Sequence, residues 1–193
     1  MSDAFIRWYR ESATTPVLAE QVELFAKHGI QLRHPALGAV MAIDVEGNNV
    51  PLEREELDRL LGLRISSITM NWWFSENVNV VDEYSYEPLG CEIQTFWLDG
   101  LTGEEAQRVE TALTEAATRF PTPTRALVID RRGISDPDDW DSIILYEGQM
   151  VPEFPDRVIV QGQVASRFLQ ASPELLREEG GSGLSLLTSR RLA

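Results

Sequence analysis

The clearest hydrophobic pattern in the chain is a period of two between residues 65 and 98. Over Ile65–Phe74, apolar residues alternate with polar ones, which is typical of a strand with one buried face. Turn-forming residues separate this segment from two further strand-like runs, Val78–Tyr86 and Cys91–Leu98. The pattern therefore predicts three consecutive antiparallel strands.

A change to helical periodicity follows directly after these strands. Thr102 and Glu105 have the spacing of a capping box, in which each side chain bonds the other residue's backbone amide. The apolar residues beyond them recur at helical spacing and would form one inner stripe: Val109, Leu113 and Ala116. We therefore expect a helix over residues 103–118.

Weaker signals predict the remaining elements. A helix is expected over residues 16–28, with Thr15 as its cap and Pro16 at its first position, and a short one over Glu53–Leu61. Strands are expected at Leu37–Val45, Arg125–Asp130, Ser142–Tyr146 and Val158–Val160. The segment Val164–Leu169 fits either a strand or a helix.

The order of these elements indicates an α+β fold. We expect an antiparallel sheet that contains a β-β-β-α-β-β block, with the helices packed on one face. The length of 193 residues fits one domain, assigned to residues 1–179. Residues 180–193 are interpreted as a Gly/Ser-rich linker and a loose C-terminal tail.

The pairing register decides which side chains face the helix. With a three-residue loop after Phe74, Trp72 would pair with Val80, and Trp72 would lie beneath the helix. The opposite face would then present aromatic rings among carboxylates: Trp73, Glu83, Glu92 and Phe96. The alternative is a three-layer core in which the N-terminal helices cover Trp73 and Phe96.

The charge of the chain is strongly acidic and unevenly distributed. The net charge is −14, and residues 65–107 hold eight acids and three of the five tryptophans without one Lys or Arg. This charge disfavours binding to nucleic acid or to an anionic membrane. It favours a basic protein partner, although acidity also promotes solubility.

A second acidic cluster lies further along the chain, at Asp136, Asp138, Asp139 and Asp141, with Trp140 among them. It does not fit the EF-hand calcium loop, because Trp140 stands where a ligand belongs. Two interpretations stay open. The aspartates form a charged contact for a partner, or they surround a single helical turn that Ser135 caps and Trp140 anchors.

The sequence carries no recognised catalytic or metal-binding motif, and no cofactor is predicted. Cys91 is the single cysteine, which fits a reducing compartment, and its place in a strand among acids favours a raised pKa. His28 and His34 lack metal-ligand spacing. A catalytic pairing of His34 with Cys91 or an aspartate has no motif to support it.

Neither a signal peptide nor a long apolar run is visible, so we expect a cytoplasmic protein. Lys27 is the single lysine beside 16 arginines, which indicates a GC-rich, bacterial genome. In its general profile the chain resembles the bacterial immunity proteins, which are small acidic α+β proteins that neutralise a toxin by binding it. Such a resemblance implies a non-catalytic inhibitor of a basic protein.

The residues expected to bind such a partner are Trp73, Glu83, Glu92, Phe96, Asp136, Asp138, Asp139, Trp140 and Asp141. Two alternative functions are retained. The first is an enzyme or small-ligand-binding protein with an aromatic-lined pocket between the sheet and the helices. The second is an assembly subunit with a large apolar patch. The oligomeric state stays open.

Overall fold

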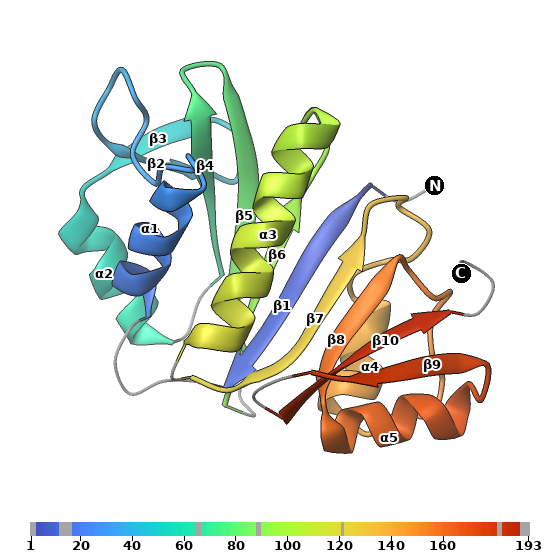
Figure 1. The fold of residues 1–193 in the computed structure, drawn as a ribbon. Coiled ribbons are helices and arrows are strands. Elements are labelled where there is room, and N and C mark those ends of the chain that lie inside the picture. The colour runs from blue at the N-terminus through green and yellow to red at the C-terminus, as the bar shows by residue number, and fades with distance from the viewer. Residues whose placement is uncertain are drawn as a thin grey trace.

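The computed structural model describes residues 3–11, 17–64, 67–87, 90–120, 122–180 and 183–189. These residues form one antiparallel sheet of ten strands, in the order β3-β2-β4-β5-β6-β1-β7-β8-β10-β9, together with five helices (Figure 1). The expected α+β class is confirmed.

The strands are β1 (Phe5–Glu11), β2 (Val40–Ile43), β3 (Asn49–Leu52), β4 (Ile68–Ser75), β5 (Val78–Glu87), β6 (Cys91–Trp97), β7 (Thr124–Asp130), β8 (Arg157–Gln161), β9 (Leu175–Glu179) and β10 (Leu184–Ser189). The helices are α1 (Leu18–Lys27), α2 (Arg54–Leu63), α3 (Gly103–Arg119), α4 (Asp139–Leu145) and α5 (Gly162–Ala171).

The predicted succession of three strands, a helix and a strand corresponds to β4, β5, β6, α3 and β7. Trp72 pairs with Val80 as expected, but the loop differs from the expected three residues. Ser75 pairs with Val78, so the turn has two residues, and a bulge between Trp73 and Ser75 restores the pairing of Trp72. The capping box is also confirmed, because the Glu105 amide donates to the Thr102 hydroxyl over 3.3 Å and the Thr102 amide donates to the Glu105 carboxylate over 2.8 Å. Local sequence signals therefore placed this block correctly.

β1 is a central strand that the hydrophobic pattern did not predict. It pairs with β6 on one side and with β7 on the other. Its apolar side chains are buried on both faces of the sheet: Phe5, Ile6, Trp8 and Tyr9. A strand that is buried on both faces has no simple alternation of apolar and polar residues, so the period-two signal is lost.

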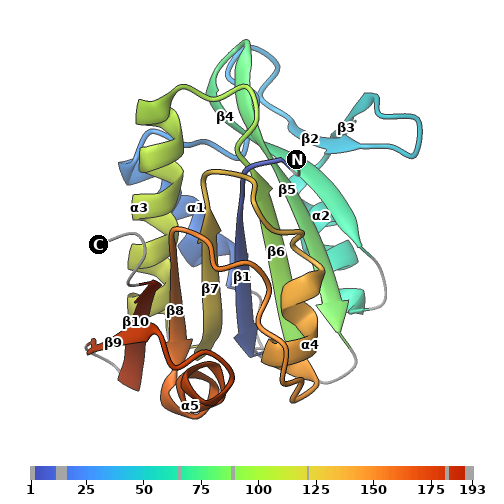
Figure 2. The same cartoon turned by 90° about the vertical axis from the view of Figure 1, so that its right-hand side faces the viewer.

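Helices cover both faces of the sheet (Figures 1 and 2). On the first face, α1, α2 and α3 pack over side chains that include Trp8, Trp72 and Phe96. On the second face, α4 and α5 pack over Phe5, Tyr9 and their neighbours. The expectation that all helices pack on one face therefore holds only for α1, α2 and α3. β1 and β7 also carry apolar side chains on the second face, and α4 and α5 shield these from solvent.

One expected strand is a helix in the structure, and one ambiguous segment is decided. Ser142–Tyr146 was predicted as a strand, but residues 142–145 belong to α4, where Ile143, Ile144 and Leu145 are all buried. A short apolar run fits a buried helical turn as well as a strand. The ambiguous segment Val164–Leu169 lies within α5.

The expected loose tail is wrong for Leu184–Ser189, which forms β10. This strand pairs with β8 on one side and with β9 on the other. Its partners lie earlier in the chain, so its order depends on tertiary pairing. The predicted cap Thr15, Pro16, and part of the predicted linker, Gly181 and Ser182, lie outside the described residues.

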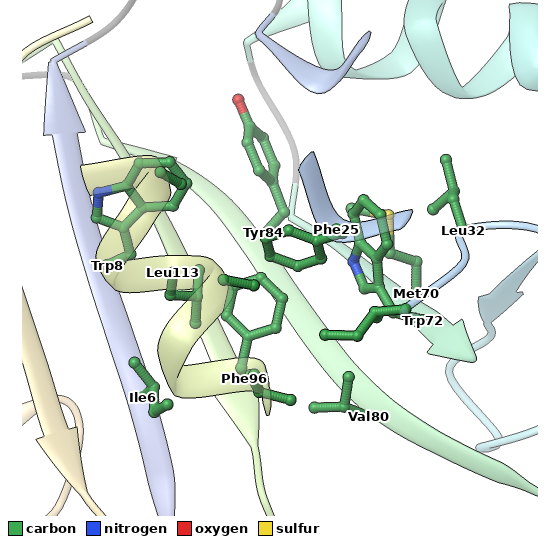
Figure 3. Close-up of a cluster of buried hydrophobic side chains, with 14 of the residues drawn as sticks. Ile6, Trp8, Phe25, Leu32, Met70, Trp72, Val80, Tyr84, Phe96 and Leu113 are labelled. Carbon is green, nitrogen blue, oxygen red and sulfur yellow. The ribbon is translucent and has the colours of Figure 1, made fainter. Parts of the chain in front are cut away.

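The core of the first face is built around large aromatic rings, as Figure 3 shows. The Phe25 ring of α1 lies 4.7 Å from the Trp72 ring and 5.8 Å from the Phe96 ring, measured between centroids. Trp72 was expected beneath the 103–118 helix, but its direct aromatic cover comes from α1. α3 instead packs along β1 and β7.

Candidate functional site

A groove of about 660 Å³ lies on the second face, between the strands β1, β5 and β6 and the segment that contains the start of α4. We call it the acidic groove. Figure 2 shows α4 and the loop before it on this side of the sheet. Its lining residues are Asp3, Arg7, Glu83, Ser85, Glu87, Thr95, Trp97, Asp136, Pro137, Asp138 and Asp141.

Strand alternation positions one wall of the acidic groove. Glu83, Ser85 and Glu87 are alternate residues of β5, so their side chains leave the same face of the sheet. Glu83 pairs with Thr95 of β6, and the indole Nε1 of Trp97 donates to Glu83 Oε2 over 3.3 Å. The wall therefore combines carboxylates with a half-buried indole ring.

A buried carboxylate organises the opposite wall. Asp130 lies at the end of β7, and its Oδ2 accepts hydrogen bonds from the Ser135 amide at 2.9 Å and the Ser135 hydroxyl at 2.7 Å. The Ser135 hydroxyl in turn accepts a hydrogen bond from Trp140 Nε1 at 3.0 Å. This network fixes the loop that places Asp136 and Asp138 at the rim.

The floor of the acidic groove contains Arg7, whose side chain is only 9% exposed. Its Nη2 lies 3.0 Å from both carboxylate oxygens of Asp141 and 3.2 Å from Asp138 Oδ1. Its Nη1 donates to the Thr95 hydroxyl over 2.8 Å. The groove thus already holds one guanidinium group between carboxylates.

The electrostatics of this floor favour a permanently charged Arg7. Burial lowers the pKa of the Arg7 guanidinium. Tyr9, Asp141 and Asp138 together raise this pKa by a larger amount, so the net shift is upward. Burial also raises the pKa of the Tyr9 phenol, which therefore keeps its proton and donates to Asp141 over 2.6 Å.

The lining contains six carboxylates and one guanidinium, which gives a formal balance of five negative charges. Arg7 neutralises part of the charge of Asp138 and Asp141. Among the described residues, no basic side chain forms an ion pair with Glu83, Glu87 or Asp136. The groove therefore has an unbalanced negative field beside the Trp97 ring.

Four of the predicted partner-binding residues lie together in this groove: Glu83, Asp136, Asp138 and Asp141. The sequence treated Glu83 and the 136–141 cluster as separate alternatives. The fold joins them because β1 carries Arg7 between β6 and β7, where it reaches Asp141.

The other predicted partner-binding residues lie outside the acidic groove. Trp73 is buried, with its ring 4.4 Å from the His34 ring, and Phe96 and Trp140 are fully buried. Trp140 stacks on Phe168 at 6.0 Å, as an anchor of α4. Asp139 is exposed but does not line the groove.

Glu92 is also buried, and it forms an ion pair with Arg10 over 2.8 Å. Glu92 and Phe96 were expected on the open face. The observed pairs of Val81 with Trp97 and of Glu83 with Thr95 turn them to the first face. A strand assignment that differs by one residue exchanges the two faces, so Trp97 takes the place that Phe96 was expected to occupy.

Among the described residues, Cys91 and His34 form no hydrogen bond with each other or with an aspartate. Cys91 is buried, and burial raises the pKa of its thiol to about 12. His34 Nδ1 accepts hydrogen bonds from the amides of Ala36 and Leu37, as part of a turn. Within the described ranges, no group of three or more His, Cys, Asp or Glu residues is arranged to hold a metal ion.

Comparison with known proteins identified no relative of this chain. The chain matches no protein-family model, no curated protein and no solved structure. Among the helices of the described residues, none has the length and apolar character needed to cross a membrane. Functional inference therefore rests on the geometry of the acidic groove.

Proposed function

We propose that this protein is a non-catalytic binding protein that captures a basic protein partner in the acidic groove, in the manner of an immunity-type inhibitor. The observation that carries the proposal is the convergence of six carboxylates and the half-buried Trp97 from three distant parts of the chain. A field of one sign increases the rate at which an oppositely charged partner associates.

Arg7 supports a preference for guanidinium groups. The carboxylate of Asp141 and the hydroxyl of Thr95 hold the chain's own arginine at the floor. An arginine or lysine of the partner would meet Glu83, Glu87 and Asp136, which are not paired with Arg7. Trp97 would supply aromatic contact area, and aromatic residues contribute strongly to protein interfaces.

The position of Asp82 favours binding over catalysis. Burial raises the pKa of this carboxyl group to about 7, as in many catalytic acids. Asp82 nevertheless lies in the core of the first face and does not line the acidic groove. Asp82, the carboxyl group whose pKa lies near neutrality, is therefore not part of the proposed binding site.

The test uses charge reversal in two matched proteins. The variant Glu83→Lys changes the groove, and Glu76→Lys makes the same change of charge at an exposed acid of the β4–β5 turn in the same base-free segment. Affinity capture from an extract of the source organism would identify the partner. The partner should associate more slowly with the groove variant at low salt, and Glu76→Lys should have little effect.

The difference in association rate should shrink at high ionic strength, where the long-range field is screened. Equal association of all three proteins at low salt would contradict the proposal. Loss of binding in both variants would point to net charge alone and would also contradict a specific role for the groove.

A second candidate is the binding of a small organic cation. The volume of about 660 Å³ lies within the range typical of small-molecule sites, and an indole beside carboxylates suits a cation–π contact. Calorimetry with spermidine as the probe would separate the two functions. Saturable binding that Trp97→Ala removes would favour the small cation.

A further inference from the structure

Asp82 is a fully buried carboxyl group on the first face, where the backbone of β5 pairs it with Met70 of β4 and Phe96 of β6. Its Oδ2 accepts hydrogen bonds from Trp72 Nε1 at 2.9 Å and Gln94 Nε2 at 2.7 Å. Among the described residues, no donor reaches its Oδ1. One oxygen is thus satisfied and the other lies bare in the core.

The surroundings of Asp82 oppose its ionisation. Burial raises its pKa to about 7, and the hydrogen bonds from Trp72 and Gln94 oppose this shift without cancelling it. The nearby cation, Arg10 of β1, is already paired with Glu92 of β6 over 2.8 Å. A carboxylate at Asp82 would therefore be a second buried anion beside a single buried cation.

The other groups around Asp82 add little positive charge. β4 contributes the uncharged Met70 and Trp72, β5 contributes the phenol of Tyr84, and the adjacent Glu83 disfavours ionisation of Asp82. Arg64, at the end of α2, lies over the ring of Tyr86. α3 packs apolar residues into the first-face core, and its buried Glu110 pairs with Arg131 and Arg157. Its Arg108 lies over the Phe74 ring and donates to the His28 carbonyl at the end of α1 over 2.8 Å. The His28 ring lies 2.9 Å from Glu115 of α3.

α1 covers both neighbours of Asp82. Its Phe25 ring contacts the rings of Trp72 and Phe96 (Figure 3). Trp72 donates a hydrogen bond to Asp82, and Phe96 of β6 is the residue that pairs with Asp82 of β5. One turn earlier, Gln21 is fully buried, and neither its side-chain oxygen nor its nitrogen has a partner among the described residues. The charged residues of α1 are exposed: Glu20, Glu23 and Lys27.

We propose that the proton on Asp82 controls how firmly α1 packs on the sheet. With Asp82 neutral, the apolar contacts of Phe25 hold α1 in place. When Asp82 ionises, its unpaired oxygen requires water. β5 is hydrogen-bonded to a strand on each side, whereas α1 rests on the sheet through side chains, so α1 is the element that moves to admit water.

The direction of the pH effect follows from linkage. The pKa of Asp82 is higher in the folded protein than the value of about 3.9 typical of an unfolded chain. The stabilisation is therefore complete below about pH 4 and is lost as the pH rises through about 7. The contribution of Asp82 to the packing of α1 should therefore be largest below about pH 4 and should decrease steadily up to about pH 7.

The first test needs no variant. Carboxyl carbon NMR of the wild-type protein should give an Asp82 titration midpoint near neutrality, and a midpoint below pH 5 would overturn the proposal. Amide hydrogen exchange, corrected for intrinsic rates, should show α1 losing at least about tenfold more protection than α3 between pH 5.5 and 8. Equal losses in the two helices would also overturn it.

Two variants then isolate the proton. Asp82→Asn keeps an oxygen that accepts the bonds from Trp72 and Gln94, and Glu76→Gln, at the exposed turn between β4 and β5, is the control. The folding equilibrium constant of the wild type relative to Asp82→Asn should fall by roughly thirtyfold between pH 5.5 and 8. A ratio that does not change with pH would refute the proposal, and if Asp82→Asn does not fold, the wild-type NMR titration decides.

Discussion

On the first face of the sheet, acids of β5 and β6 are buried beneath helices, whereas on the second face acids of β5 line an open groove. Asp82 and Glu83 are adjacent in β5, yet Asp82 has no exposed surface and Glu83 is exposed. α1 packs over the first, while α4 and its preceding loop only flank the second.

The comparison shows that acidity alone does not identify a binding surface. The buried acids are matched by specific donors: Trp72 and Gln94 for Asp82, and Arg10 for Glu92. The acids of the groove are more exposed to solvent, and few of them form an ion pair with a basic side chain. The same base-free strands therefore supply a hydrogen-bonded core on one face and a negative field on the other.

The largest expected difference between the faces concerns their tryptophans. Trp72→Ala should lower the free energy of unfolding by about 3–5 kcal/mol, because it leaves a cavity beneath Phe25 and removes a donor to Asp82. Trp97→Ala should cost less than about 1 kcal/mol, since its ring is only partly buried. Urea unfolding curves measure both. Equal losses would mean that the groove wall is as tightly packed as the core.

A smaller loss is expected when the groove wall loses its buried carboxylate. Asp130→Ala should reduce the free energy of unfolding by about 2–3 kcal/mol, because the amides and hydroxyl of the Ser135 turn lose their acceptor. Asp139→Ala, an exposed acid nearby, is the control and should leave the denaturant midpoint unchanged. A similar shift in both variants would contradict the organising role of Asp130.

Loss of the capping box should weaken only the cover of the first face. Thr102→Ala should cost about 1 kcal/mol, because the Glu105 amide at the start of α3 loses its acceptor. Binding at the acidic groove should not change, since Thr102 does not line it. Thermal unfolding together with partner binding checks both statements, and an unchanged stability would show that the cap contributes nothing.

The smallest effect is expected at the rim. Asp138 is 82% exposed, and Arg7 keeps its contacts with Asp141 when Asp138 is removed. Asp138→Asn should therefore leave the unfolding midpoint unchanged, as is common for exposed ion pairs. The partner's association rate should fall slightly at low salt. A clear loss of stability would show that Asp138 is part of the structural core of the floor.

Several elements could be predicted because their signals are local. The alternation in β4, the turn that pairs Trp72 with Val80, and the capping box of α3 each involve residues close in sequence. β1 could not be recognised, since both of its faces are buried. The sequence of β10 by itself predicts only a loose tail, because the order of this strand comes from its pairing with β8 and β9.

The candidate site was predicted only in its parts. The acidic character of Glu83 and of the 136–141 cluster is plain in the sequence, but their proximity is not. The exchange of Phe96 for Trp97 at the open face depends on a single residue of register in β6. No sequence signal identified Trp97 as the half-buried ring that lines the groove.

The charge, the composition and the elements that residues a few positions apart stabilise all follow from the order of the amino acids alone. Tertiary structure decided which acids are buried and which are exposed, because helix cover and strand register involve distant residues. The pair of Arg7 and Asp141 spans 134 positions. Such a contact forms only when β1 enters the centre of the sheet, and it brings the two acidic segments into one groove.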